Sequence, residues 1–404
     1  MNRIRSEFPI FGKTANEKGF VYFDNAATTQ KPAFVLNAVR LFYETHNANV
    51  HRMFHPWELA ATRHFEDARD VVRQHINAEF CEEIVFTRGT TESINLLAFA
   101  YGEKFFGKGD EVMVTELEHH SNFVPWLQLC RRKQAKLKIV PLCGDGTLDL
   151  SVLERMLSRR TKIISLTHVS NVLGTVNPVA DVVAMAKPLG IPVSVDGAQS
   201  MAHFRPDVLA LGCDFYSFSG HKMFAPGGTG ILYARKRWLE QMVPWQTGGE
   251  MMNRVTASHV TYNNLPYRFE AGALDYAGIC GLSAAIRFLN GTGWDRIQKH
   301  ESELCQYAFK HLTELQNIRI FSNPENCRGV ISFRFQDMHS YDVAVMLNAM
   351  GFALSSGEHC AQPLMDALGV ESSLRISFAI YNTMEEIDRL IEAIHLAKKR
   401  IKGS

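Results

Sequence analysis

Short apolar runs alternate with helix-length segments through the middle of the chain, and this alternation restricts the possible folds most. The runs lie at 84–86, 112–114, 138–140, 163–166, 192–195, 215–218 and 230–233. Continuous runs of this kind are typical of strands buried on both faces, as in a mostly parallel sheet with helices on both sides. The sequence therefore predicts an α/β fold, with helices between the strands near 121–134, 150–158 and 178–188.

The pattern changes after Gly291-Thr292-Gly293. The next segment predicts a long helix through residue 316, and the chain ends with a helix that begins at Thr383 with Glu386 three residues later, as in a capping box. Between these helices lie predicted strands at 319–321, 330–335, 353–355 and 374–377 and a helix near 341–350. We expect an N-terminal arm, a large domain and a smaller α+β domain, with bounds at 1–20, 21–290 and 291–404.

Composition excludes several classes of protein. With 404 residues, 46% of them hydrophobic, the chain is long enough for two packed domains, and its net charge of +1 gives no reason to expect nucleic acid or an anionic membrane surface. No apolar run approaches the ~20 residues of a membrane span, and no long apolar core follows the basic N-terminus. The eight cysteines form no C-x-x-C and the histidines no H-E-x-x-H, so we expect reduced thiols in a cytoplasmic protein and no metal site.

Two of the predicted strands end in side chains of opposite charge. One strand leads to Asp196, and another leads through Ser219-Gly220-His221 to Lys222. Ligands of such sheets bind at the carboxyl ends of the strands. A lysine can form a Schiff base with an aldehyde, and pyridoxal phosphate requires that lysine together with a carboxylate for its pyridinium nitrogen. Taken singly, a lysine that begins a surface loop and an aspartate that caps a turn are the commoner interpretations.

A third stretch, Gly89-Thr90-Thr91, precedes a predicted helix. Backbone N–H groups and hydroxyls at such a position can face an anion, although alone the stretch reads as an ordinary threonine N-cap. The chain contains neither G-x-x-x-x-G-K-[ST] nor G-x-G-x-x-G, so the sequence supports neither a nucleoside-triphosphate site nor a dinucleotide site.

Taken together, these segments resemble the fold-type I pyridoxal-phosphate enzymes of the class V aminotransferase branch, and most closely the Suf-type cysteine desulfurases. The resemblance runs from Tyr22 to Thr383. It rests on seven motifs in the family's order: Val50-His51-Arg52, Arg88-Gly89-Thr90-Thr91-Glu92, Glu118-His119-His120, Asp196-Gly197-Ala198-Gln199, Ser219-Gly220-His221-Lys222, Arg268-Phe269-Glu270-Ala271-Gly272 and His359-Cys360-Ala361.

The resemblance implies an aspartate-aminotransferase-like large domain and pyridoxal 5'-phosphate as cofactor. Lys222 would bind the aldehyde and then act as base and acid, Asp196 would hold the ring nitrogen protonated, Gln199 would bind the phenolic oxygen, and His119 would stack on the ring. Without the resemblance, His119 reads as a satisfied polar histidine or a neighbour of a helix cap. The cradle for the cofactor phosphate would consist of Thr90, Thr91, Ser219 and His221.

The resemblance also implies the reaction. Asn171 and Arg375 would grip the carboxylate of L-cysteine, the planar guanidinium being suited to bidentate binding. Taken alone, Arg375 reads as a surface charge at a strand edge. Cys360, in a polar loop, would take the sulfur as a persulfide and release L-alanine, with His359 favouring its thiolate. The sulfur would supply iron–sulfur cluster assembly through a Suf-type acceptor protein, and the enzyme would be a homodimer.

Three positions depart from the family pattern. Ala273 stands where a threonine usually reaches the phosphate across the dimer, Ser355 where an arginine is common, and Glu358 where Suf-type enzymes often have histidine. Two alternatives therefore stay open. One is a selenocysteine lyase, acting on L-selenocysteine, or another class V enzyme, and the other is a partner-dependent sulfur-relay subunit with weak activity of its own.

Overall fold

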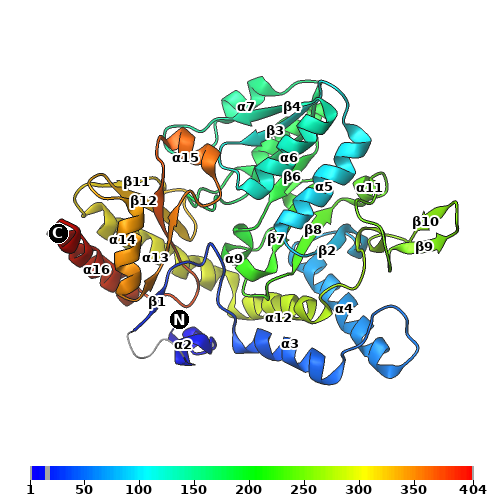
Figure 1. Ribbon diagram of the computed structural model, residues 1–404, viewed down its shortest axis with the longest axis horizontal. Coiled ribbons are helices and arrows are strands. Elements are labelled where there is room, and N and C mark those ends of the chain that lie inside the picture. The colour runs from blue at the N-terminus through cyan, green and yellow to red at the C-terminus, as the bar shows by residue number, and fades with distance from the viewer. Residues whose placement is uncertain (1, 14–18, 403–404) are drawn as a thin grey trace.

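The computed structural model describes residues 2–13 and 19–402, and a seven-stranded sheet forms the centre of its larger part (Figure 1). The strand order is β2-β8-β7-β6-β5-β3-β4. The five strands from β3 to β7 are parallel, and β8 runs antiparallel to both of its neighbours, β7 and β2, so the prediction of a mostly parallel sheet is confirmed. The strands are β2 Ile84–Thr87, β3 Glu111–Thr115, β4 Lys136–Val140, β5 Thr161–Thr167, β6 Val193–Asp196, β7 Phe215–Ser219 and β8 Gly230–Ala234.

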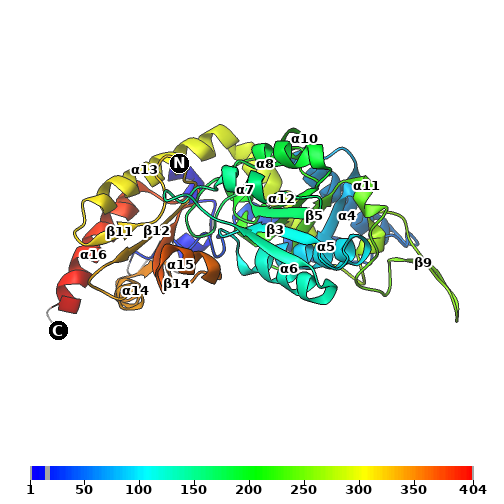
Figure 2. The ribbon, with the colours of Figure 1, turned by 90° about the horizontal axis from the view of Figure 1, so that it is seen from above.

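Successive side chains along the strands pack alternately into two separate hydrophobic cores, one on each face of the sheet. On β3, Val112 and Val114 pack with Trp126 of α6, whereas Met113 between them joins the core on the opposite face. This is the period of two that a strand imposes. Figure 2 shows the consequence, with α5 (Thr90–Phe105) and α6 (His120–Lys133) on one side of the sheet and α8 (Val179–Ala186) and α10 (Val208–Leu211) on the other.

Three longer helices complete the larger part. They are α3 (Ala33–Thr45), α4 (Pro56–His75) and α12 (Tyr276–Thr292), and they lie side by side below the sheet in Figure 1. The sequence predicts neither α12 nor the projecting hairpin of β9 (Met252–Val255) and β10 (Val260–Tyr262). The short elements are α7 Leu150–Met156, α9 Ser200–His203, α11 Lys236–Leu239, η1 Cys81–Glu83, η2 Lys187–Leu189, η3 Gly220–Lys222 and η4 Tyr267–Phe269.

The smaller part is a four-stranded antiparallel sheet covered by helices. Its order is β11-β12-β15-β14, so β14 is an edge strand. The strand predicted at 353–355 is in fact two, because the chain leaves β13 at Ala353 and enters β14 at Ser355. The elements are β11 Ile318–Ile320, β12 Val330–Phe335, β13 Phe352–Ala353, β14 Ser355–Gly357, β15 Ser373–Ser377, α13 Trp294–Thr313, α14 Ser340–Ala349, α15 Gln362–Leu368 and α16 Met384–Lys402.

The predicted capping box at the start of α16 is confirmed. The amide of Glu386 donates to Oγ1 of Thr383 (3.3 Å), and the amide of Thr383 donates to Oε2 of Glu386 (3.2 Å). Each side chain thus satisfies an N–H group that the first helical turn leaves without a partner. Among the described residues, no helix combines the length and the apolar character needed to cross a membrane.

Segments from both ends of the chain meet between the two parts. Strand β1 (Val21–Tyr22) pairs in parallel with β13, and the Phe8 ring packs 4.7 Å from that of Tyr381. The predicted arm, residues 1–20, lies partly outside the described residues, and its described segment includes α1 (Asn2–Arg5) and α2 (Ile10–Lys13). The division into domains at residues 21–290 and 291–404 remains our proposal.

Candidate active site

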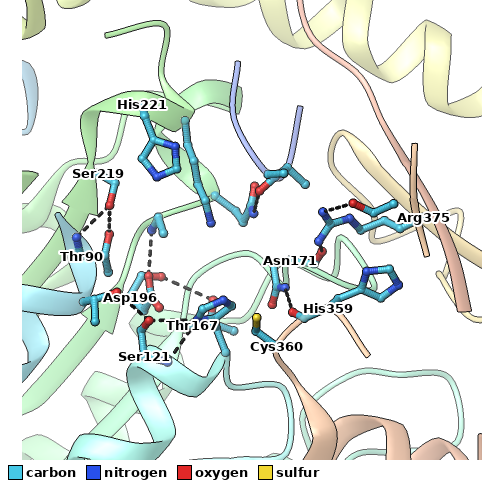
Figure 3. A pocket seen from close by; sticks show the side chains of 18 of the residues that line it. Thr90, Ser121, Thr167, Asn171, Asp196, Ser219, His221, His359, Cys360 and Arg375 are labelled. Carbon is cyan, nitrogen blue, oxygen red and sulfur yellow. Dashed lines mark hydrogen bonds between the residues drawn. The ribbon is translucent and has the colours of Figure 1, made fainter. Parts of the chain in front are cut away.

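One cavity of about 430 Å³ lies where the carboxyl ends of the parallel strands meet the smaller part (Figure 3). All the residues that the sequence predicts for cofactor, substrate and catalysis line it: Thr90, Thr91, His119, Asn171, Asp196, Gln199, Ser219, His221, Lys222, Cys360 and Arg375. Residues up to 285 positions apart in the chain are therefore brought to one place, since the set runs from Thr90 to Arg375. The roles assigned to them remain predictions.

Asp196 ends β6 and is only 3% exposed. One of its carboxylate oxygens, Oδ1, accepts a hydrogen bond from the amide of Ala198 (2.9 Å), and the other has no hydrogen-bond partner within the described chain. Burial raises the pKa of this carboxyl group, whereas the Ala198 amide and the charge of Lys222 oppose that rise. A buried carboxylate with one oxygen open to a cavity is suited to a cationic ring N–H.

Lys222 ends the 3₁₀ turn that follows β7. Its ammonium makes no hydrogen bond to any residue in the part of the chain that the structure describes, and burial lowers its pKa to about 8, with Asp196 opposing. An amine with this pKa is partly neutral near pH 8, which is the form that attacks an aldehyde. The Lys222 amine and the Asp196 carboxylate thus line the same cavity and affect each other's protonation.

The start of α5 forms the proposed anion cradle. The N-cap of α5 is Gly89, with a φ of 156°. Glycine has no side chain that could cap the helix, so the alternative of an ordinary threonine N-cap does not hold. Instead, the amide and hydroxyl of Thr90 both lie 2.8 Å from Oγ of Ser219 at the end of β7. Gly89 also passes so close to β8 that a Cβ on Gly230 would lie 2.3 Å from its Cα. Uncapped helix N–H groups and hydroxyls together favour an anion.

His119 is the N-cap of α6. Its Nδ1 accepts a hydrogen bond from the amide of Ser121 (3.1 Å), so His119 caps the helix itself, where the sequence alone suggested a satisfied polar histidine or a neighbour of a helix cap, and it also lines the cavity. Burial, together with the charge of Lys222, lowers the pKa of His119 to about 3, so the ring is neutral. Gln199 donates one amide hydrogen to the carbonyl of Ala26 (2.8 Å), which leaves its second amide hydrogen available.

Glu118, next to His119, belongs to the Glu118-His119-His120 motif, but the sequence predicts no role for it. It is fully buried and accepts hydrogen bonds from Thr115, Asn122 and the amide of Thr167, at 2.6, 2.6 and 3.0 Å. These bonds join β3, α6 and β5 directly below His119, and burial raises the pKa of Glu118 to about 8. A glutamate before a helix reads as a solvated charge in the sequence, so only the tertiary contacts reveal its role.

The side of the cavity opposite the cradle centres on Arg375 of β15, which is 5% exposed (Figure 3). Its Nη1 donates to the carbonyl of Asn171 (3.0 Å), and its Nη2 lies 3.3 Å from Oδ1 of Asp24 and 3.2 Å from Oγ of Ser355. Its Nε is buried without a partner in the described structure. An unsatisfied guanidinium N–H beside the amide of Asn171 is suited to a carboxylate. The alternative of a surface charge is wrong, because the side chain is buried.

Cys360 follows β14 and its side chain is exposed. Both His359 and Cys360 adopt left-handed backbone angles, with φ of 53° and 55°. The expectation that His359 favours the thiolate is wrong, because burial and Arg375 lower the pKa of His359 to about 3 and its Nε2 lies 2.9 Å from Oγ of Ser373. A neutral imidazole engaged elsewhere does not stabilise an anion on the next residue.

The residues present fit pyridoxal phosphate. A half-open buried carboxylate, an amine without a partner and an uncapped helix start with two hydroxyls are the three contacts that the cofactor needs. Across residues 2–13 and 19–402, no three His, Cys, Asp or Glu side chains are grouped so as to hold a metal ion. The cavity can therefore hold an aldehyde cofactor, an amino acid carboxylate and a second nucleophile, Cys360, together.

Comparison with known proteins gives the same picture. The family model described as aminotransferase class V matches residues 21–390. A protein of Halalkalibacterium halodurans named probable cysteine desulfurase is 45% identical over 398 residues, which are 98% of each chain. A cysteine desulfurase of Serratia proteamaculans is 44% identical over 400 residues, covering 99% of this chain and 98% of its own.

Solved structures extend this similarity to the fold. The cysteine desulfurase CsdA of Escherichia coli, in an S-sulfonic acid form, superposes with a TM-score of 0.91 at 38% identity and 98% coverage of both chains. The apo cysteine desulfurase of Thermococcus onnurineus superposes with a TM-score of 0.93 at 35% identity, again with 98% coverage of both.

Proposed function

The chain belongs to the class V aminotransferase family, and from this premise we propose that it is a pyridoxal-phosphate-dependent cysteine desulfurase that converts L-cysteine to L-alanine. The relatives named cysteine desulfurase cover the whole length of the chain and support this activity. The observation that carries the proposal is the single cavity that Lys222, Asp196, Arg375 and Cys360 share.

The cofactor half of the cavity would hold pyridoxal phosphate. When bound, this group supplies an aldehyde that condenses with amines and a ring that withdraws electrons from the substrate's α-carbon. The Lys222 amine would hold the aldehyde and later carry protons, and Asp196 would keep the ring nitrogen protonated. Gln199 would donate to the phenolic oxygen, and the neutral ring of His119 would cover the cofactor face. Thr90, Thr91, Ser219 and His221 would hold the phosphate.

The other half binds the amino acid and takes its sulfur. Arg375 and Asn171, which both line the cavity, would bind the substrate carboxylate. The Cys360 thiolate attacks the substrate sulfur, so that an S–S bond forms while the Cβ–S bond breaks and its electron pair stays with carbon. The Lys222 ammonium then donates a proton to that carbon. The products are alanine and a persulfide on Cys360.

Alanine and sulfide formation from L-cysteine test the proposal. The purified protein should be yellow, with absorbance near ~420 nm from the cofactor joined to a lysine. Lys222→Ala should lose both the absorbance and alanine formation, whereas Lys187→Ala, a change of an exposed lysine, should lose neither. Alanine formation that survives in Lys222→Ala would refute the mechanism. Parallel assays with L-selenocysteine decide between a desulfurase and a selenocysteine lyase.

The functional unit that we propose is a homodimer. The loop before α4 and the first turn of α4 leave large apolar side chains in solvent, with Phe54 88% and Trp57 66% exposed, and Met53 59% exposed beside them. An exposed apolar cluster of this kind is typical of a surface covered by another protein. Sedimentation equilibrium tests this, and Phe54→Glu should shift the protein towards the monomer.

We also propose that a Suf-type acceptor protein takes the persulfide from Cys360 for iron–sulfur cluster assembly, in the cytoplasm. The exposed position of Cys360 supports transfer to another protein, and the eight unpaired cysteines are consistent with a reducing compartment. Mixing the protein with ³⁵S-labelled cysteine and a purified acceptor should move the label to the acceptor, and Cys360→Ser should prevent this.

A further inference from the structure

The carbonyl oxygen of His221, the residue before Lys222, is a convergence point for the N-terminal segment 28–31. It accepts hydrogen bonds from the amide and hydroxyl of Thr29, from the hydroxyl of Thr28 and from Nζ of Lys31, each at 3.1 Å. A carbonyl oxygen has two lone pairs, so these four donors exceed what it needs. The mechanism above uses none of these donors.

Lys31 is the charged member of this group. Its ammonium also contacts the carbonyl of Thr29 and Oγ1 of Thr28, but no carboxylate in the described chain forms an ion pair with it. Burial lowers the pKa of Lys31 to about 8. A partly buried ammonium that is paired only with neutral oxygens is costly to keep, unless its charge or its hydrogen bonds serve the site.

The contacts of segment 28–31 bracket Lys222 on both sides. Before Lys222, Lys31 and Thr29 hold the carbonyl of His221, and after it, the amide of Phe224 donates to Oγ1 of Thr29 (2.8 Å). Phe224 itself has a left-handed φ of 69°, an unfavourable angle for an aromatic residue that requires support. The segment therefore fixes the turn from which the Lys222 side chain enters the cavity.

The charge of Lys31 also acts on the proposed phosphate cradle. Burial, then Lys222, then Lys31 lower the pKa of His221 to about 4, so the His221 ring is neutral. The side chains of the cradle, Thr90, Thr91, Ser219 and neutral His221, carry no positive charge, although the group they would hold is anionic. Lys31 places a cation on the backbone carbonyl of His221, whose side chain belongs to this cradle.

We propose that Lys31 is a positioning residue for Lys222, acting through the His221 carbonyl, and that its charge favours the phosphate group of the cofactor. This inference rests on the proposed function, because it assumes that the cavity binds pyridoxal phosphate. A variant without the ammonium should therefore bind the cofactor more weakly and in a less defined orientation.

The test uses full-length apoprotein titrated with pyridoxal phosphate, with the dissociation constant taken from absorbance near ~420 nm and the orientation from circular dichroism in the same band. Lys31→Met should weaken binding roughly tenfold to hundredfold, as for loss of a hydrogen bond to a charged group, and reduce the dichroic signal. Lys31→Arg, which keeps the charge, should recover most of the affinity, and Lys31→Gln should lie between the two. Lys108→Met, in an exposed turn, is the control.

A Lys31→Met protein with a dissociation constant within twofold of the wild type and the same dichroism overturns the inference, as do equal losses in the Met and Arg variants. If Lys31→Met does not fold, Lys31→Gln decides by the same twofold criterion. A wild type that does not bind pyridoxal phosphate at all overturns the proposed function itself. If the wild type binds pyridoxal phosphate and the Lys31 variants bind it equally well, only the proposed role of Lys31 is overturned.

Discussion

The two nucleophiles of the cavity stand on different kinds of backbone. Lys222 follows β7, an inner strand that is fully buried and hydrogen-bonded to β6 on one side and β8 on the other. Cys360 follows β14, an edge strand with β15 as its single partner in the sheet, and its side chain is exposed. Lys222 thus stands on a short turn that follows an inner strand, whereas Cys360 stands on a turn that follows an edge strand.

That turn is held by a few hydrogen bonds to the larger part. Asn171 donates to the carbonyl of His359 (2.9 Å), and the amide of His120 donates to the carbonyl of Cys360 (2.8 Å). Each left-handed non-glycine residue costs about 1 kcal/mol, so these bonds must offset roughly 2 kcal/mol for His359 and Cys360 together. The difference follows the two tasks, because the amine must keep one position while the thiol must meet first the substrate and then an acceptor.

The largest expected effect separates the cofactor half of the cavity, around Lys222, from the half that contains Cys360. Cys360→Ala should lower alanine formation by roughly a thousandfold or more, because it removes the exposed thiol that lines the cavity, yet leave the cofactor absorbance unchanged. Steady-state alanine release and the visible spectrum measure both. Cys143→Ala, which changes the other exposed cysteine, is the control. A Cys360→Ala protein that loses its cofactor would show that the halves are not independent.

The next largest effect concerns the residues that would bind the substrate carboxylate. Arg375→Gln should raise KM for cysteine roughly tenfold to hundredfold with a smaller change in kcat, since a hydrogen bond to a charged group contributes about 1.5–3 kcal/mol. Arg319→Gln changes an exposed arginine on the same sheet and should leave KM unaltered. An unchanged KM in Arg375→Gln would show that the substrate carboxylate binds elsewhere, and not in the half of the cavity that contains Arg375 and Cys360.

The contrast between the halves also governs what the sequence could predict. The strands that lead to Asp196 and Lys222 were predictable because burial on both faces leaves an unbroken apolar run, and the topology of parallel strands then brings their ends together. The edge strand before Cys360 carries no such signal. Its three residues, Ser355, Ser356 and Gly357, are polar or small, and the sequence merged it with β13.

The site itself was predictable in membership but not in its supports. All the predicted residues line the cavity, because motif resemblance identifies the groups that would touch a ligand. Glu118, Lys31 and Asp24 act through other residues, and the sequence assigned none of them a role, although Glu118 belongs to one of the family motifs. The neutrality of His359 was unpredictable for the same reason, since it follows from burial beside Arg375, which is distant in the chain.

A third prediction concerns the buried half alone. The rate at which apoprotein captures pyridoxal phosphate should rise about tenfold per pH unit between pH 6 and 7 and level off above pH 8. The reason is that burial lowers the pKa of Lys222 from 10.5 to about 8, so the reactive neutral amine is mostly formed above pH 8. Stopped-flow absorbance measures this. A rate that keeps rising to pH 10 would indicate an amine with the ordinary pKa, and Lys222→Ala supplies the background.

The smallest expected effect tests whether the half of the cavity around Arg375 and Cys360 depends on single hydrogen bonds as much as the cofactor half around Lys222. Ser355 Oγ donates to Oδ1 of Asp24 (2.6 Å) and accepts from Nη2 of Arg375 (3.2 Å), so it links the edge strand to the guanidinium where the family commonly has an arginine. Ser355→Ala removes that link but leaves the ion pair between Arg375 and Asp24 in place. Loss of one neutral hydrogen bond of about 0.5–1.5 kcal/mol should raise KM for cysteine about threefold, with kcat and the cofactor spectrum unchanged.

Ser356→Ala is the matched control, because Ser356 also lines the cavity but its hydroxyl forms no hydrogen bond within the described chain. Steady-state kinetics of both variants at one pH measure the difference. If the two substitutions change KM equally, Ser355 does not position Arg375, and the carboxylate site is held by the ion pair with Asp24 and the Asn171 carbonyl alone. The geometry around Arg375 would then be set by contacts from the rest of the fold and not by the edge strand β14.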